Sequence, residues 1–123
     1  HVEMDYREDP LLCHEIIDRM EWECEKNLGV RMVIHYDPVV TDNPELLQLK
    51  EDCAKYLQQQ DPRLTLHDFR MIQGQRHMNL VFDVALPSDL RQQQREIRSE
   101  LECALSREEN RVYHVIINYD VAQ

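Results

Sequence analysis

Glycine and proline are scarce in this chain, with two glycines and five prolines among 123 residues. Such scarcity argues against disordered or low-complexity segments, and a hydrophobic content of 42% is sufficient for a packed core. Long apolar runs are missing too, since none approaches the ~18–20 residues that a membrane span requires. The sequence therefore predicts a soluble chain that folds as one domain, or as two small halves sharing a core.

Positive charge is in the minority. The chain carries 14 Lys and Arg against 24 Asp and Glu, a net charge of −10 at pH 7. Nucleic acids and anionic membrane surfaces both repel such a chain, so we do not expect either as a partner. The acidity suits a protein that handles cations, although it also suits an ordinary soluble protein.

Closely spaced cysteines and the common catalytic motifs are also absent. Cys13, Cys24, Cys53 and Cys103 include no CxxC pair, which argues against a zinc ribbon or a thioredoxin-like site and favours buried thiols in a reducing compartment. The sequence contains no GxSxG, no glycine-rich phosphate loop and no HExxH. We therefore do not expect an enzyme.

The hydrophobic periodicity and the turn residues predict strand, helix, strand over the first forty residues, then helix, strand, strand, helix, strand. Asp9-Pro10 and Asn43-Pro44 are typical helix starts, and Gly29 is a typical helix end. The predicted strands cover residues 1–6, 30–37, 64–72, 77–86 and 111–119, with a turn at 73–75, and the predicted helices cover 10–28, 44–59 and 88–107.

A weak internal repeat relates the two parts of the chain. Glu15-Ile16 aligns with Glu96-Ile97, and 33–37 aligns with 116–120, so that His1 falls on Phe82. This alignment predicts a partial strand–helix–strand unit over 1–42 and a complete αββαβ unit over 43–123. Helices that cross over between strands would cover one face of each sheet, which predicts a ferredoxin-like α+β architecture.

The stretch Val33-Ile34-His35-Tyr36-Asp37-Pro38 is the first candidate site. It has the pattern of a buried strand that proline ends, and the two-residue period of a strand turns His35 and Asp37 the same way. Imidazole nitrogen and carboxylate oxygen suit a divalent cation such as zinc. An isolated His-x-Asp is also common as an ordinary polar strand end, so the motif alone leaves both interpretations open.

Four stretches together resemble a known family: 66–70 (Leu-His-Asp-Phe-Arg) before a glycine turn, the strand His1-Val2-Glu3, the helix with His14, and 34–38 (Ile-His-Tyr-Asp-Pro). In this order and spacing they resemble the cytoplasmic C-terminal domain of cation diffusion facilitator transporters, also called cation efflux proteins. These transporters export zinc and related divalent cations, and their soluble domain has a metallochaperone-like αββαβ fold, forms dimers and binds metal. The resemblance thus implies a regulatory domain at the cytoplasmic face of the membrane. Its implied partners are a second copy, the transmembrane portion of the transporter, and Zn²⁺ or another divalent transition metal.

The resemblance also implies which residues bind the metal. The family's ligand positions fall on His1, His14, His35 and Asp37, and two further positions fall on His67 and Asp120 in the second unit. Three imidazoles and a carboxylate would make a tetrahedral zinc site. The first unit lacks the family's opening helix and strand, which is the pattern of a fragment excised from a longer transporter.

Departures from the family pattern leave other functions open. In the second unit Phe82 and Asn118 stand where the family has histidines, which favours a dimerisation module that has lost its metal. A small-molecule sensor of the ACT type is a third possibility. His67 and Asp68 are adjacent in a strand and should face opposite sides, so we expect Asp68 to form an ion pair with Arg70 instead of sharing a metal with His67.

Overall fold

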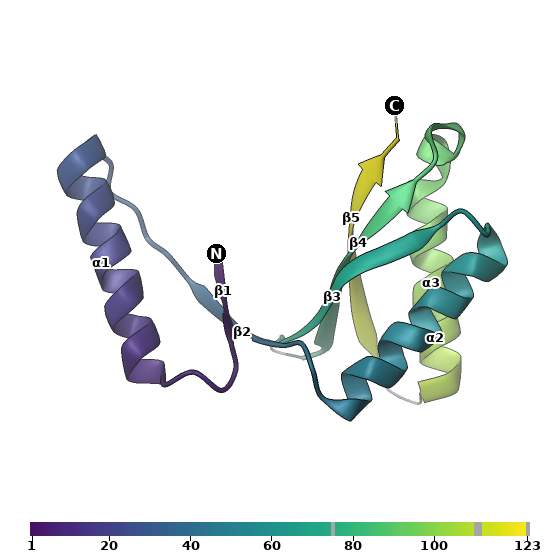
Figure 1. Ribbon diagram of the computed structural model, residues 1–123, viewed down its shortest axis with the longest axis horizontal. Helices are drawn as coiled ribbons and strands as arrows, with labels where there is room; N and C mark the ends of the chain where they lie inside the picture. Colours follow the sequence, from purple (N-terminus) through teal and green to yellow (C-terminus); the bar gives the residue numbers. More distant parts are fainter. Residues whose placement is uncertain (75, 110–111, 123) are drawn as a thin grey trace. The chain divides into compact units, whose positions relative to one another are not determined.

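The computed structural model describes residues 1–74, 76–109 and 112–122, and the fold class is α+β. The chain divides into two compact units, His1–Val39 and Val40–Gln123 (Figure 1). No helix in these described ranges has both the length and the apolar character needed to cross a membrane.

Unit 1 is a strand–helix–strand element made of β1 (Val2–Asp5), α1 (Pro10–Leu28) and β2 (Tyr36–Val40). β1 and β2 pair in parallel, with Val2 opposite Tyr36. The predicted helix boundaries are confirmed. Asp9 accepts a hydrogen bond from the backbone N–H of Leu11 at 3.1 Å, and Gly29 ends the helix in the left-handed conformation, at φ 64°.

The second strand of unit 1 differs from its prediction. The segment from Val30 to His35 forms no regular structure, and β2 begins at Tyr36 and continues through Pro38. The carbonyl of His35 accepts a hydrogen bond from Val2 at the start of β1, and the carbonyl of Val39 accepts one from Tyr6 just after it. In a parallel pair alternate residues bond to a given neighbour. The N–H that Pro38 lacks is therefore not needed for pairing with β1, so the proline does not end the strand. The His-x-Asp motif lies at the start of a strand, and the prediction of a strand end is wrong.

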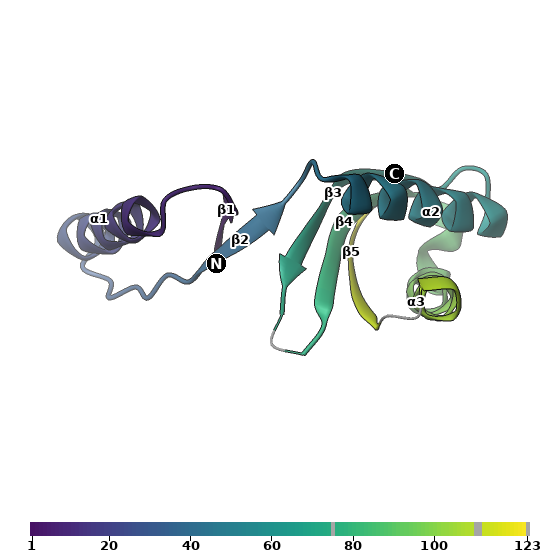
Figure 2. The ribbon, with the colours of Figure 1, turned by 90° about the horizontal axis from the view of Figure 1, so that it is seen from below.

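Unit 2 has the order α2, β3, β4, α3, β5. β3 pairs antiparallel with β4, β4 pairs in parallel with β5, and both helices lie on one side of the three strands (Figure 2). The residues predicted to begin the last helix form a 3₁₀ helix, η1, before α3. The predicted turn residue Gln75 and strand start Arg111 lie outside the described residues. The elements are α2 (Pro44–Gln60), β3 (Thr65–Gln73), β4 (Met78–Leu86), η1 (Ser88–Gln93), α3 (Gln94–Glu109) and β5 (Tyr113–Val121).

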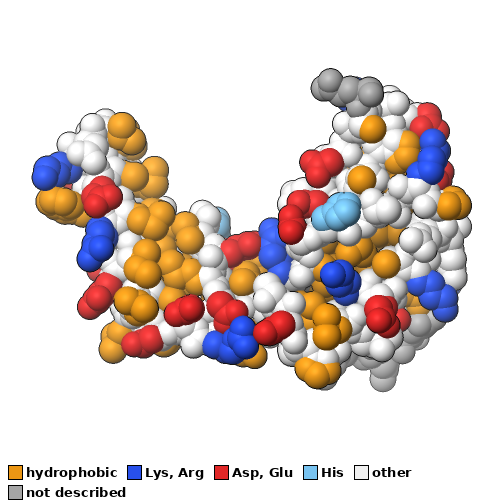
Figure 3. Space-filling model, viewed as in Figure 1, with side chains coloured by type: hydrophobic (Ala, Val, Ile, Leu, Met, Phe, Trp, Pro, Cys, Tyr) orange, Lys and Arg blue, Asp and Glu red, His pale blue; other side chains and the backbone are white. Residues whose placement is uncertain are grey.

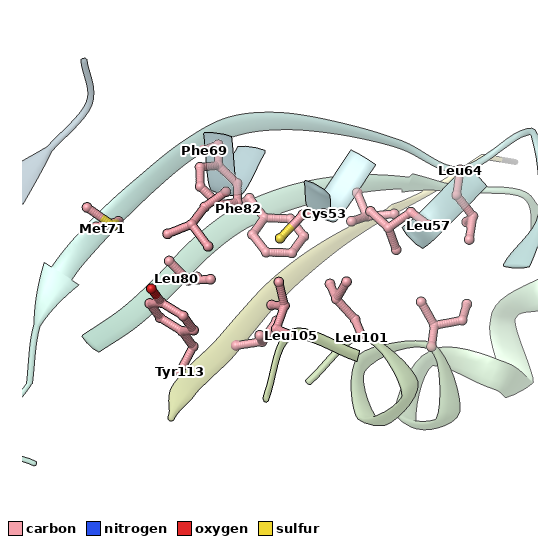
Figure 4. Packing of buried hydrophobic residues seen from close by; sticks show 14 of the residues in the cluster. Cys53, Leu57, Leu64, Phe69, Met71, Leu80, Phe82, Leu101, Leu105 and Tyr113 are labelled. Carbon is pink, nitrogen blue, oxygen red and sulfur yellow. The ribbon is translucent and has the colours of Figure 1, made fainter. Parts of the chain in front are cut away.

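The main core lies between the helices and the sheet of unit 2 (Figure 4). Alternate residues of β4 face it, and Leu57 and Cys53 of α2 and Leu101 of α3 pack against them with no exposed surface or almost none. Unit 1, which is described in full, buries only the apolar side chains of Cys13, Ile17 and Val39. Cys103 is exposed, so the prediction of buried thiols is wrong at that position.

β3 contains a β-bulge centred on Asp68, whose φ is +55°. Leu66 before the bulge and Phe69 after it both turn toward the core, although strict alternation would separate them. Phe69 stacks on Phe82 with ring centroids 5.2 Å apart. The extra residue thus changes which side chains of β3 face inward halfway along the strand.

Candidate metal centre

The starts of β1 and β2 bring ionisable side chains to one face. Glu3 lies opposite Asp37 in the parallel register, and the two-residue period places His1 and His35 on the same face, one step earlier. His1 Nδ1 lies 3.1 Å from Asp37 Oδ2, and the His1 and His35 rings have centroids 5.4 Å apart. The structure therefore brings together three of the four residues predicted as the main metal site.

These three side chains have the donor atoms that a borderline divalent metal prefers, two imidazoles and a carboxylate. They are also accessible, since the side chains of His1 and Asp37 are 71% and 32% exposed. Within the described ranges, no three His, Cys, Asp or Glu side chains converge closely enough to hold a metal ion. The arrangement is a His–Asp pair with a second imidazole beside it. Its nitrogen and oxygen atoms are of the types that bind such a metal, and all three side chains lie on one face of the paired strands.

His14, the fourth predicted ligand, has a different neighbour. Its Nε2 lies 3.4 Å from Asp18 Oδ2, one turn further along α1, and the side chain is 71% exposed. Cys13 and Ile17 are buried, and because each helical residue turns about 100° from the last, His14 lies to one side of the buried face of α1. The structure does not bring His14 together with His1, His35 and Asp37.

Glu3 is a residue of this face that the sequence analysis did not include in the metal set. Its side chain is exposed and stands across from Asp37 in the strand register. The pattern that could have identified it is the alternation His1-Val2-Glu3, because a strand turns residues two apart to the same face. Asp5 completes this alternation but is held by Arg7, whose side-chain hydrogen bonds lower the pKa of Asp5 to about 2.

The parallel pair β4–β5 of unit 2 corresponds to the pair β1–β2 of unit 1. The residues that correspond in the two pairs differ from those that the sequence alignment matched. Val84 lies opposite Tyr119 in β4 and β5, as Val2 lies opposite Tyr36 in β1 and β2. In this register Asp83 is the counterpart of His1. By this register the predicted match of His1 with Phe82 is wrong, because Phe82 lies one residue away from the counterpart of His1.

A polar row crosses the three strands of unit 2 at this level. His67 lies opposite Asp83, Asp83 lies opposite Asn118, and Asn118 Nδ2 donates to Asp83 Oδ1 at 3.3 Å. Asp120, the other predicted ligand, lies opposite Ala85, two residues further along β5. Asp83 was missed by the sequence analysis, although its place between the core residues of β4 marks it as facing outward.

The bulge alters the environment of His67. Both His67 and Asp68 are exposed, which a regular strand would not allow for adjacent residues on a one-sided sheet. Arg70 Nη1 donates to the backbone carbonyl of Asp68 at 2.9 Å, a contact with the main chain and not the carboxylate contact that was predicted. His67 Nε2 lies 3.4 Å from the Thr65 hydroxyl.

Comparison with known proteins gives no assignment. No model of a known protein family matches this chain, and no curated protein matches it significantly. The resemblance to cation efflux proteins therefore stays a prediction from the motifs.

Proposed function

We propose that this chain is a regulatory domain of the cation-efflux type, which binds Zn²⁺ or a similar divalent ion at the starts of β1 and β2. The observation that carries the proposal is the placement of His1, His35 and Asp37 on one face, with His1 and Asp37 already in contact at 3.1 Å. The proposal includes a ferredoxin-like fold. Unit 2 has the order αββαβ, and unit 1 has the order βαβ, which is that of the last three elements of unit 2. It also includes a cytoplasmic location, a homodimer and attachment to the transmembrane portion of a transporter.

In this function the imidazoles of His1 and His35 and the carboxylate of Asp37 would hold the ion, with Glu3 next to them on the same face. A bound ion would supply positive charge between the two strand starts, where Glu3 lies opposite Asp37. Residues 1–39 contain ten Asp and Glu against four Lys and Arg, so the local field attracts cations. The ion would favour whichever arrangement of the domain engages all its ligands, and this population shift would report the metal level. The function is binding and regulation, without catalysis.

A thermal melt with and without zinc tests this proposal. A ligand that binds only the folded chain adds about 2.7 kcal/mol of stability at a hundred times its dissociation constant. We expect zinc to raise the melting temperature of the metal-free chain, and His35→Ala to remove most of the rise. Protons compete with the metal for imidazole nitrogen, so the rise should also disappear below about pH 6.

Two further histidine variants make this test specific. His77→Ala removes an exposed imidazole from the turn before β4, so it should leave the zinc effect intact. His14→Ala decides whether the α1 histidine joins the site, because only a ligand changes the zinc effect when it is removed. If zinc stabilises neither the original chain nor any variant, the metal has no place in the function.

A second candidate function is an interaction module that binds no metal. The observation that favours it is the number of large apolar side chains that unit 1 exposes, which marks a surface that contacts another protein. Sedimentation of the metal-free chain distinguishes the two candidates, since an interaction module associates in the presence of a chelator. The exposed apolar residues of unit 1 are Tyr6, Leu11, Leu12, Ile16, Met20, Trp22, Leu28, Val30, Met32 and Val33.

A further inference from the structure

Three of these apolar residues form a continuous row on α1. Leu12, Ile16 and Met20 follow one another at four-residue spacing and are 46%, 40% and 38% exposed. They adjoin the buried side of the helix, because Cys13 and Ile17 are almost fully buried beside them. Figure 3 shows hydrophobic side chains gathered over this part of unit 1. We call Leu12, Ile16 and Met20 the α1 stripe.

Unit 2 contains a covered counterpart of this helix. Glu21 of α1 accepts a hydrogen bond from the backbone N–H of Ile34 at 3.0 Å. Glu102 of α3 accepts the same kind of bond from the N–H of Val115 at 2.8 Å. In both units a glutamate of the helix thus holds the backbone just before the following strand or near its start. We align α1 with α3 by placing Glu21 on Glu102. In this alignment Ile16 matches Ile97 and Met20 matches Leu101.

The matched residues differ in burial. Ile97 and Leu101 are 4% and 0% exposed, while Ile16 and Met20 are about two-fifths exposed. In unit 2 the covering element is α2, whose Gln60 side chain donates to the carbonyl of Ile97 at 3.3 Å, and whose apolar side packs into the same core. The chain from α2 leads into β3, which pairs antiparallel with β4. In unit 2, therefore, α2 covers the apolar side of α3, and the strand that follows α2 pairs with β4.

The matching strand edge in unit 1 is open. β1 corresponds to β4 and lies at a sheet edge, and its one strand partner in the described part of the chain is β2. The edge of β4 that corresponds to this open edge is the one that β3 covers. Unpaired backbone groups at a strand edge are a template for another strand. In the described part of the chain, the α1 stripe is not covered by a helix as Ile97 and Leu101 are by α2, and the outer edge of β1 has no antiparallel strand as β4 has in β3.

We propose that the α1 stripe and the open edge of β1 bind an amphipathic helix that leads into an antiparallel strand, an element built like α2 and β3 but additional to them. The charge of the surface favours a basic partner over a second copy. α1 carries five acidic and two basic side chains, and unit 1 has a net charge of −6, so two copies of this surface repel each other. The partner helix presents apolar residues at the spacing of Leu46, Leu49, Cys53 and Leu57 in α2, with Lys or Arg beside them.

Binding of a synthetic peptide tests this proposal. The probe is a fluorescein-labelled peptide with the sequence of residues 44–73, in which Glu51→Lys and Asp52→Lys make the helix more basic. Its binding to the whole chain is measured by fluorescence anisotropy in a chelator, so that the result does not depend on the proposed metal site. We expect saturable binding that Met20→Glu weakens ~tenfold or more, because the new carboxylate would be buried without a partner. The peptide without the two lysines should bind more weakly.

Controls separate docking from general stickiness or loss of fold. Met20→Leu, which copies Leu101 of α3, should retain or strengthen binding and shows that the site accepts an apolar side chain. Leu47→Glu changes a side chain of α2 that is 51% exposed and lies outside the stripe, so it should leave binding unchanged. The proposal is overturned if the peptide does not bind, or if it binds the Met20→Glu chain equally well. It is also overturned if the chain alone forms a dimer that Met20→Glu dissociates, because a second copy is then the occupant.

Discussion

Truncation of Leu101 and of Met20 to alanine should have very different effects, although the two residues occupy matching helix positions. Leu101 is fully buried between α3 and the sheet, and Leu→Ala at such sites costs about 3–5 kcal/mol, because a cavity remains. Met20 keeps 38% of its surface exposed, and its removal opens no closed cavity, so we expect a cost of about 1 kcal/mol. The difference of a few kcal/mol measures what the covering helix and strand contribute in unit 2.

Urea unfolding followed by two probes provides the measurement. Far-UV circular dichroism follows all helices, while fluorescence of Trp22, the one tryptophan of the chain, follows α1. Two probes are needed because the units can unfold separately, and a single midpoint would then mix two transitions. Equal costs for Leu101→Ala and Met20→Ala would refute the inference that α1 lacks a cover, since Met20 would then be as fully enclosed as Leu101.

Two other predictions concern β3 and its neighbours in unit 2. Asp68→Gly should raise the free energy of unfolding by about 0.5–1 kcal/mol, because glycine adopts the positive φ of the bulge without the steric cost that other residues have. Urea denaturation measures this change, and a loss of stability would contradict the bulge geometry. Arg63→Gln should lower the melting temperature slightly at pH 7 and should lose this effect in strong acid, where both of its carboxyl partners are protonated. The reason is that hydrogen bonds from Arg63 lower the pKa of both Asp61 and Asp89, so their contribution is present above the ordinary carboxyl pKa and is lost as the pH falls through the lowered values. An effect of Arg63→Gln that does not change between pH 7 and pH 2 would contradict this ion-pair account.

The helix boundaries could be predicted because their causes are local. Asp9 and Asn43 cap helices that begin with proline, and Gly29 takes the left-handed conformation that ends one. The limits of β2 could not be predicted in this way, because they depend on a partner. The alternation of Val30, Met32 and Ile34 continues a strand pattern, but β1 begins only at Val2 and its register starts β2 at Tyr36.

In the candidate site, too, some features follow from the local sequence and others depend on how the elements pack. The closeness of His1, His35 and Asp37 follows from the parallel pairing of two strands and the two-residue period, both of which the sequence indicates. The position of His14 depends on how α1 is rotated, which is set by the burial of Cys13 and Ile17 and is not visible in the helix sequence alone. The bulge at Asp68 was not predicted either, because glycine is the usual residue at a positive φ and aspartate gives no clear indication.

The bulge in β3 lets the length of this strand change by one residue without turning its side chains over. The register pairs His67 with Asp83 and Arg70 with Val81, so β3 takes three steps where β4 takes two, and Asp68 is the extra residue. Deletion of Asp68 would therefore leave a regular ladder, in which Leu66 and Phe69 still face the core because they would then lie two residues apart. In a strand without a bulge, the loss of one residue would exchange the two faces for everything beyond it. At this point of β3 the same loss would only remove the irregularity.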